Sequence, residues 1–277
     1  MPELPEVETV TRALSKVITN CKIILVEIQR DDLRWKIPKS LKLDLKDDSF
    51  GKPYRKGKYI LNPTKKGNVL LIHLGMSGQI KIKDNIPDLV KHDHFRIIIR
   101  DKNNQIFSVT YNDPRRFGYI DCFKKGEIKK HFLLKNLGLE PFEDDLTSQY
   151  LFDIFKRKKI NIKTALLDQR IIAGIGNIYA NEILFRAGIR PEKKVSNIKF
   201  KSLKLIINST KEILLQSINK GGTTIKDHKQ PDGKLGYFKQ NLQVYGRDDQ
   251  KCRKCSNNIK LIVISNRSTF FCSKCQK

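Results

Sequence analysis

The chain has 277 residues, 39% of them hydrophobic, and its 55 Lys and Arg outnumber 29 Asp and Glu, for a formal net charge of +26. The apolar share suffices for buried cores and excludes a globally disordered chain, while the length suits two domains with a small appended module. The charge favours a polyanionic partner, and nucleic acid offsets such charge by counterion release. A lysine-rich composition along the whole chain accounts for part of the excess.

The first residues are acidic and lack an apolar stretch, so they do not predict a signal peptide. No apolar run approaches the length of a membrane-spanning helix, and we expect no membrane partner. Cys21 and Cys122 stand apart from the other four cysteines and are expected to be small buried apolar residues. With no disulfide framework indicated, we expect a cytoplasmic protein in a reducing compartment.

The first half of the chain is rich in β-branched residues and follows one expected helix. The helix is predicted from about Pro5, since proline suits the first helical position and Val7, Val10, Leu14 and Val17 line one face. These patterns predict a β-sandwich entered through one helix. The strand-like segments, separated by turns with Gly and Lys, are Lys22–Ile28, Tyr59–Asn62, Val69–Leu74, His94–Arg100, Ile106–Tyr111 and Tyr119–Phe123.

Helical patterns replace the strands in the second half. Residues 131–145 are typical of a linker. A helical domain is therefore expected between the sandwich and the C-terminal cysteines. Its helices are predicted at Leu151–Lys158, opened by Thr147 or Ser148, from Asn177 to Gly188, and from Leu203 to Ile218, stopping at Gly221–Gly222.

Four cysteines near the C-terminus form two Cys-x2-Cys pairs with sixteen residues between them. This spacing is typical of a zinc ribbon, and the intervening segments are strand-like, as its hairpin requires. The hairpin is rich in Lys and Arg, which suits a DNA groove, and it carries Arg267. Four thiolates leave no open coordination position, so we expect one structural Zn2+ held by Cys252, Cys255, Cys272 and Cys275.

The N-terminus offers a nucleophile. Met1 precedes a small residue and is normally removed, which would expose Pro2 as a secondary amine with an ordinary pKa near ~8. Such an amine can attack an electrophilic carbon, and Glu3 beside it can donate or accept a proton. By themselves these residues also permit a simpler interpretation, in which Pro2 and Pro5 begin a helix and the acids favour its positive end.

Several motifs occur in order along the whole chain, and through them it resembles the formamidopyrimidine-DNA glycosylase family, bacterial enzymes that remove oxidised purines such as 8-oxoguanine. The motifs are Met-Pro-Glu-Leu-Pro-Glu-Val-Glu at 1–8, Lys-Tyr at 58–59, His-Leu-Gly-Met-Ser-Gly at 73–78, Lys-His-Asp-His at 91–94, Asn-Asp-Pro-Arg-Arg-Phe-Gly at 112–118, Gly-Ile-Gly-Asn-Ile-Tyr-Ala-Asn-Glu at 174–182, Gly-Gly-Thr-Thr at 221–224, Tyr-Gly-Arg at 245–247 and Arg-Ser-Thr-Phe-Phe-Cys at 267–272.

The resemblance implies an α+β multidomain fold in three parts. These are an N-terminal two-layer β-sandwich with a leading helix at 1–131, a helical domain with a helix–two-turn–helix motif at 132–242, and a four-cysteine zinc-finger β-hairpin at 243–277. It also implies a monomer that binds damaged double-stranded DNA.

For catalysis, the resemblance implies that Pro2 attacks C1′ of the damaged nucleotide, the base departs, and an iminium links enzyme to DNA. Glu3 matches the family's acid/base residue. Lys58 and Arg267 match the residues assigned to the first and second elimination, and each also suits a phosphate clamp. The implied outcome is base removal followed by β,δ-elimination of the strand.

The target base must leave the helix before it can be attacked. Met76, Arg115 and Phe117 match the family's void-filling residues, two apolar wedges and a guanidinium for the estranged cytosine. Lys220–Lys229 match the loop that closes over the flipped base. Further DNA contacts are implied at His73, His92, Lys158, Lys163 and Asn177.

Asn177 opens a helix after Gly-Ile-Gly, where backbone N–H groups would hold a phosphate. Capping of the helix by its side chain is the alternative.

Three other classes of protein share some of these features. Endonuclease VIII shares the fold and chemistry but acts on oxidised pyrimidines, and Leu4 disfavours it because that branch typically has Gly there. A non-catalytic zinc-ribbon DNA-binding protein would leave Pro2 and Glu3 incidental. Helix–hairpin–helix glycosylases share Gly-Ile-Gly before a helix, but they lack an N-terminal proline and a zinc ribbon.

Overall fold

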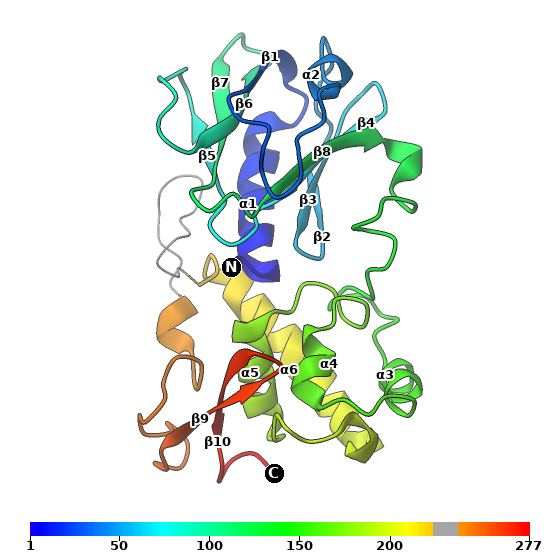
Figure 1. Ribbon diagram of the computed structural model, residues 1–277, viewed down its shortest axis with the longest axis vertical. Helices are drawn as coiled ribbons and strands as arrows, with labels where there is room; N and C mark the ends of the chain where they lie inside the picture. The colour runs from blue at the N-terminus through cyan, green and yellow to red at the C-terminus, as the bar shows by residue number, and fades with distance from the viewer. Residues whose placement is uncertain (224–237) are drawn as a thin grey trace. The chain divides into compact units, whose positions relative to one another are not determined.

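The computed structural model describes residues 1–223 and 238–277 (Figure 1). Of the predicted loop at Lys220–Lys229, the part after Thr223 therefore lies outside the described residues. Among the described residues, none of the helices combines the length and apolar character needed to cross a membrane.

The chain forms two compact units. Met1–Lys135 make up the first, together with the described ends of Lys220–Lys239, and the second consists of Asn136–Asn219 and Gln240–Lys277. The finer division into 1–131, 132–242 and 243–277 stays a prediction.

The first unit is a sandwich of two four-stranded antiparallel sheets, with strand orders β1-β6-β7-β5 and β2-β3-β4-β8. Helix α1 runs between the sheets, and its buried face shares one core with both of them (Figure 1). The two-layer sandwich with a leading helix is thus confirmed. Its elements are α1 Leu4–Ile18, β1 Lys22–Ile28, α2 Leu41–Asp44, β2 Tyr54–Lys56, β3 Tyr59–Pro63, β4 Asn68–His73, β5 Gln79–Lys83, β6 Asp93–Arg100, β7 Ile106–Asn112, β8 Tyr119–Lys124 and the 3-10 turn η1 Lys125–Glu127.

The predicted strands all form, and β1 has the predicted limits. Two further strands and α2 were not predicted from the sequence. β2 is three residues long and mostly charged, and β5 alternates apolar residues with Lys at the sheet edge, so neither has a strong local pattern. Cys21 is buried as expected, whereas Cys122 is only partly buried against the core.

The second unit combines helices with the C-terminal hairpin. Thr147 caps α3 by accepting a hydrogen bond from the Tyr150 N–H at 3.1 Å, and α5 ends at Gly188, which has a left-handed φ of 71°. The short α4 was not predicted. The elements are α3 Ser148–Phe155, α4 Ile162–Leu167, α5 Asn177–Ala187, η2 Val195–Asn197, α6 Phe200–Asn219, η3 Phe238–Asn241, β9 Ile259–Ile264 and β10 Arg267–Cys272.

Strand β8 is entered through Gly118, which lies directly over the buried Tyr111 side chain. A Cβ at Gly118 would stand 1.6 Å from the Tyr111 Oη and 2.9 Å from the His73 carbonyl oxygen. Glycine is therefore required by close packing at this point, where the loop before β8 crosses β7.

We predict that Gly118→Ala lowers the free energy of unfolding by about 2–3 kcal/mol, because the added methyl must displace a buried ring. Urea unfolding measures the change. Gly126→Ala is the matched control, since a Cβ there meets no atom within 4 Å, and equal stability of the two variants would contradict the packing argument.

Candidate active site

Pro2 and Glu3 are both buried at the start of α1. The buried Glu6 carboxylate accepts the Glu3 N–H at 2.8 Å, which completes the first turn of the helix. The same carboxylate accepts the N–H and the hydroxyl of Thr223, at 2.7 and 2.8 Å. Glu6 therefore holds the N-terminal segment next to the backbone at Thr223.

Lys58 lies in the turn between β2 and β3 and is only 7% exposed. Arg55 donates to the Glu8 carboxylate of α1 at 2.9 Å and to the Gly57 carbonyl at 2.9 Å. Gly57 has a positive φ of 57°, which glycine adopts without strain. The turn carrying Lys58 is thus tied to the helix that presents Pro2.

His73 ends β4 opposite Tyr59, with ring centroids 4.9 Å apart. Burial, together with the positive charges of Lys58 and Arg34, lowers the pKa of His73 to about 4. The Gly75 N–H donates to Nδ1 at 3.2 Å, so we assign the proton of the neutral ring to Nε2. His73 thus offers an uncharged N–H donor.

The buried carboxylate of Asp113 organises two loops at once. It accepts the Ser77 hydroxyl at 2.6 Å, the Tyr111 hydroxyl at 3.0 Å and the Gly118 N–H at 2.9 Å. The Arg115 N–H in turn donates to the Ser77 oxygen at 3.2 Å. The turn at 74–78 and the loop at 113–118 are therefore fixed to each other.

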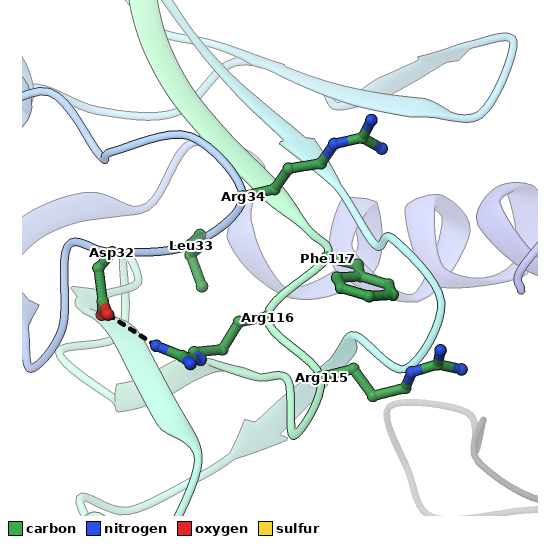
Figure 2. Close-up of a pocket in the computed structure, with 6 residues that line it drawn as sticks. All are labelled: Asp32, Leu33, Arg34, Arg115, Arg116 and Phe117. Carbon is green, nitrogen blue, oxygen red and sulfur yellow. Dashed lines mark hydrogen bonds and ion pairs between the residues drawn. The ribbon is translucent and has the colours of Figure 1, made fainter.

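These two loops carry the three predicted void-filling residues. Met76 is partly buried, whereas Arg115 is exposed and Phe117 is 42% exposed. The Arg115 guanidinium lies 4.9 Å from the Phe117 ring centroid. Figure 2 shows both side chains extending from the loop in the same direction. His92 is partly buried with a φ of 73°, and its carbonyl accepts the Asp113 N–H at 3.0 Å.

The four C-terminal cysteines converge, with all Sγ atoms within 4.8 Å of one another. The Cys252–Cys275 and Cys255–Cys272 sulfur pairs are 3.9 and 3.4 Å apart. Tetrahedral zinc with Zn–S bonds of about 2.3 Å places its sulfurs about 3.8 Å apart, so this set fits one Zn2+. The predicted cofactor and its ligands are confirmed.

Arg267 lies at the tip of the hairpin between the cysteine pairs. Ser265 and Asn266 form the tight turn, with φ values of 50° and 57°, and Arg267 pairs with Ile264 as the first residue of β10. The side chain is exposed. Its backbone position is consequently set by the turn.

Helix α4 fastens this hairpin. Lys163 is 0% exposed, and its ammonium donates to the Ser268 carbonyl at 2.8 Å and the Thr269 hydroxyl at 2.6 Å. Thr164 forms a hydrogen bond with the Ser265 hydroxyl at 2.8 Å. The covered ammonium of Lys163 therefore holds β10 in this structure, and a DNA contact at Lys163 stays a prediction.

Asn177 is the first residue of α5, but its side chain does not cap the helix. The N-cap is Gly176, and the Asn177 amide donates to the Ser268 carbonyl at 3.0 Å. The capping alternative is therefore wrong. The helix start at 176–178 remains a predicted phosphate site, and Lys158, partly exposed just beyond α3, remains a predicted DNA contact.

Glu182 was not singled out by the sequence analysis. Its buried carboxylate accepts three successive backbone N–H groups, from Gln243, Val244 and Tyr245, each at 2.9 Å. Burial raises the pKa of Glu182, while these N–H donors oppose the rise. The sequence signal that could have identified Glu182 is an acidic residue among the buried residues of a helix, because a buried carboxylate requires hydrogen-bond donors.

Models of three known domains match successive parts of the chain. The formamidopyrimidine-DNA glycosylase N-terminal domain matches residues 1–120, its H2TH domain residues 137–229, and a zinc finger found in FPG and IleRS residues 249–277. Formamidopyrimidine-DNA glycosylases of Bartonella quintana and Ruthia magnifica are 40% and 43% identical to the chain, each alignment covering 100% of both proteins. The chain belongs to the formamidopyrimidine-DNA glycosylase family.

A solved relative agrees with this assignment. The structure of Lactococcus lactis Fpg (MutM) with DNA containing N7-benzyl-Fapy-dG is 33% identical, has a TM-score of 0.91 and covers 100% of both chains. The α+β fold expected from the resemblance is thereby confirmed, including its helical H2TH domain and its cysteine hairpin.

We predict that Lys163→Met loosens the hairpin, because methionine fills the space but cannot donate to Ser268 and Thr269. Amide hydrogen exchange in β10 should accelerate by about 10-fold or more, with zinc retained. Lys159→Met, at an exposed position, is the control. Identical exchange in both variants would show that Lys163 does not hold β10.

His73 predicts a pH dependence of stability. Its folded pKa of about 4 lies below the ordinary ~6.5, so the unfolded chain takes up a proton first as the pH falls. The stability from neutral His73 is complete above about pH 6.5 and is lost progressively towards about pH 4. Between these limits His73→Gln should lose less stability than the wild type in urea titrations, and parallel losses would refute the assignment.

Proposed function

We propose that the chain is a bifunctional DNA glycosylase and AP lyase of base-excision repair, which removes oxidised purines, 8-oxoguanine and formamidopyrimidines, from duplex DNA. Family membership supports this, as do the solved complexes of the L. lactis relative with Fapy-dG and abasic-site DNA. The observation that carries the proposal is the buried pair Pro2 and Glu3 at the start of α1, held by Glu6.

In this mechanism Met1 is removed, since its carbonyl would otherwise acylate the Pro2 nitrogen. The Pro2 amine bonds to C1′ as the glycosidic bond to the damaged base breaks. Glu3 protonates the sugar ring oxygen, the ring opens, and an iminium joins Pro2 to C1′. This electron sink permits elimination first at the 3′ and then at the 5′ phosphate, leaving a one-nucleotide gap.

The other predicted site residues act on the backbone and the stack. Lys58 and Arg267 stabilise the departing phosphates, and His73 donates its neutral N–H to the backbone. Met76, Arg115 and Phe117 fill the space left by the extruded nucleotide. His92, Lys158 and the α5 start around Asn177 bind phosphates.

The four-thiolate zinc supplies rigidity to the Arg267 hairpin and takes no part in the reaction. The partner is damaged double-stranded DNA, bound by a monomer in the bacterial cytoplasm at the nucleoid. The net charge of +26 suits that partner.

We predict that borohydride traps the protein on duplexes containing 8-oxoguanine opposite cytosine, with the cross-link at Pro2, because reduction fixes the iminium. Pro2→Gly should lower the trapping rate by about 100-fold or more, whereas Pro5→Ala, at a proline that does not react, should keep it. Peptide mapping by mass spectrometry locates the bond.

Absence of a trapped complex on every lesion, or a native N-terminus that retains Met1, would rule out this mechanism and favour a non-catalytic zinc-ribbon protein. A duplex with an oxidised pyrimidine belongs in the same experiment, since the L. lactis relative was also solved with such DNA. Faster trapping on the pyrimidine would move the chain towards endonuclease VIII specificity.

We predict that removing zinc with a chelator abolishes DNA binding, since the hairpin loses its fixed geometry. Fluorescence anisotropy on an abasic-analogue duplex measures the loss, and added Zn2+ should restore binding. Labelling of the Pro2 amine should stay unchanged in the zinc-free protein. Unchanged DNA binding by the zinc-free protein would show that the hairpin is not part of the DNA interface.

A further inference from the structure

An open cleft of about 540 Å³ lies beside Arg115 and Phe117 in the first unit. Its lining comes from two loops, one before α2 and one before β8, and includes three arginines, of which Arg116 is directed at Asp32 (Figure 2). The lining residues are Asp32, Leu33, Arg34, Arg115, Arg116 and Phe117.

The acid in this lining is already neutralised. Asp32 accepts two hydrogen bonds from Arg30, at 2.7 and 2.8 Å, and one from Arg116 at 2.6 Å. The hydrogen bonds from Arg30 are the main cause that lowers the pKa of Asp32 to about 2. The charges that remain for a ligand are therefore those of Arg34 and Arg115.

Arg34 stands on a preorganised loop. Its guanidinium lies 4.7 Å from the ring centroid of Trp35, and that ring meets Tyr119 and Phe132 edge-on at 5.3 and 6.2 Å. Leu33, the preceding residue, is 7% exposed and anchors the loop in the core. A guanidinium stacked on an indole keeps its N–H edge free for a planar acceptor.

Across residues 1–223 and 238–277, no ion pair joins Arg34 or Arg115 to a carboxylate. Figure 2 shows Arg34 and Arg115 extending in the same direction with Phe117 between them. An aromatic ring flanked by two such cations matches a nucleotide step, in which a base is flanked by phosphates.

We propose that Arg34 binds a backbone phosphodiester of the duplex next to the extruded nucleotide, forming with Arg115 and Phe117 one nucleotide-sized subsite. This rests on the proposed insertion of Arg115 and Phe117 into DNA. If Phe117 enters the stack, the sugar-phosphate backbone passes the cleft, and the Arg34 fork meets phosphate oxygens in bidentate geometry. The phosphate belongs to the lesion strand or to the strand opposite.

The test uses full-length, zinc-loaded protein and a duplex with a tetrahydrofuran abasic analogue opposite cytosine, followed by fluorescence anisotropy over a salt series. Arg34→Gln should weaken binding by about 10-fold and reduce the slope of log K against log salt by about 0.9. Arg34→Lys should keep the slope while losing part of the affinity. Arg100→Gln, an exposed arginine ending β6, is the matched control and should change affinity less than about 2-fold.

Single methylphosphonate linkages then identify the phosphate, placed one at a time around the abasic analogue and around the opposite cytosine. At the contacted position the methylphosphonate should lower the affinity of the wild-type protein by about 10-fold, whereas the affinity of Arg34→Gln should fall no further. The strand in which this occurs is the source of the phosphate.

Two results would overturn the subsite. One is that the affinity losses from the methylphosphonate and from Arg34→Gln add at every linkage, and the other is that a folded Arg34→Gln variant keeps the wild-type affinity and salt slope. Thermal unfolding and zinc content establish that the variant is folded, and Arg34→Lys supplies the second variant. Failure of the proposed function is distinguishable, because then wild-type protein itself neither binds the abasic duplex nor forms a trapped complex.

Discussion

A buried carboxylate must be surrounded by hydrogen-bond donors, and this constraint places most of the functional segments of the chain. Glu6 collects donors from the N-terminus and from Thr223, and Asp113 collects them from the two loops that carry the predicted wedge residues. Glu182 does the same for the backbone at 243–245 that leads to the cysteine hairpin. In each case one acid fixes backbone segments distant in sequence, because loss of any donor would leave a charged group unsatisfied.

The arginines that contribute to the large positive charge fall into two groups. Some arginines form ion pairs within the protein, as Arg55 does with Glu8 and Arg116 with Asp32. Others extend into solvent from backbone that is firmly fixed, Arg115 on the loop held by Asp113 and Arg267 at a two-residue turn. A cation on fixed backbone loses little further entropy when it meets a phosphate, so these positions favour specific contact over diffuse attraction.

Much of the fold could be predicted because its signals are local. Strand β1 and the helices beginning at Ser148 and Asn177 follow from periodicity, capping and glycine placement. The four zinc cysteines follow from spacing. Helix α4 was not predicted because six residues carry little periodicity, although Asn161 caps the helix by accepting the Thr164 N–H at 2.8 Å.

The sequence by itself determined the family, the order of the longer helices and of most strands, the zinc ligands and the residue types available for chemistry, since each depends on neighbours or fixed spacings along the chain. The tertiary structure alone decided which charged groups are covered and which are exposed. Lys163 and Arg34 are both basic residues in locally unremarkable sequence, yet one is 0% exposed and holds β10 while the other faces an open cleft. The reason is physical: the exposure and partners of a long charged side chain are set by segments that pack around it from elsewhere in the chain, as β10 does for Lys163 over a separation of 105 residues.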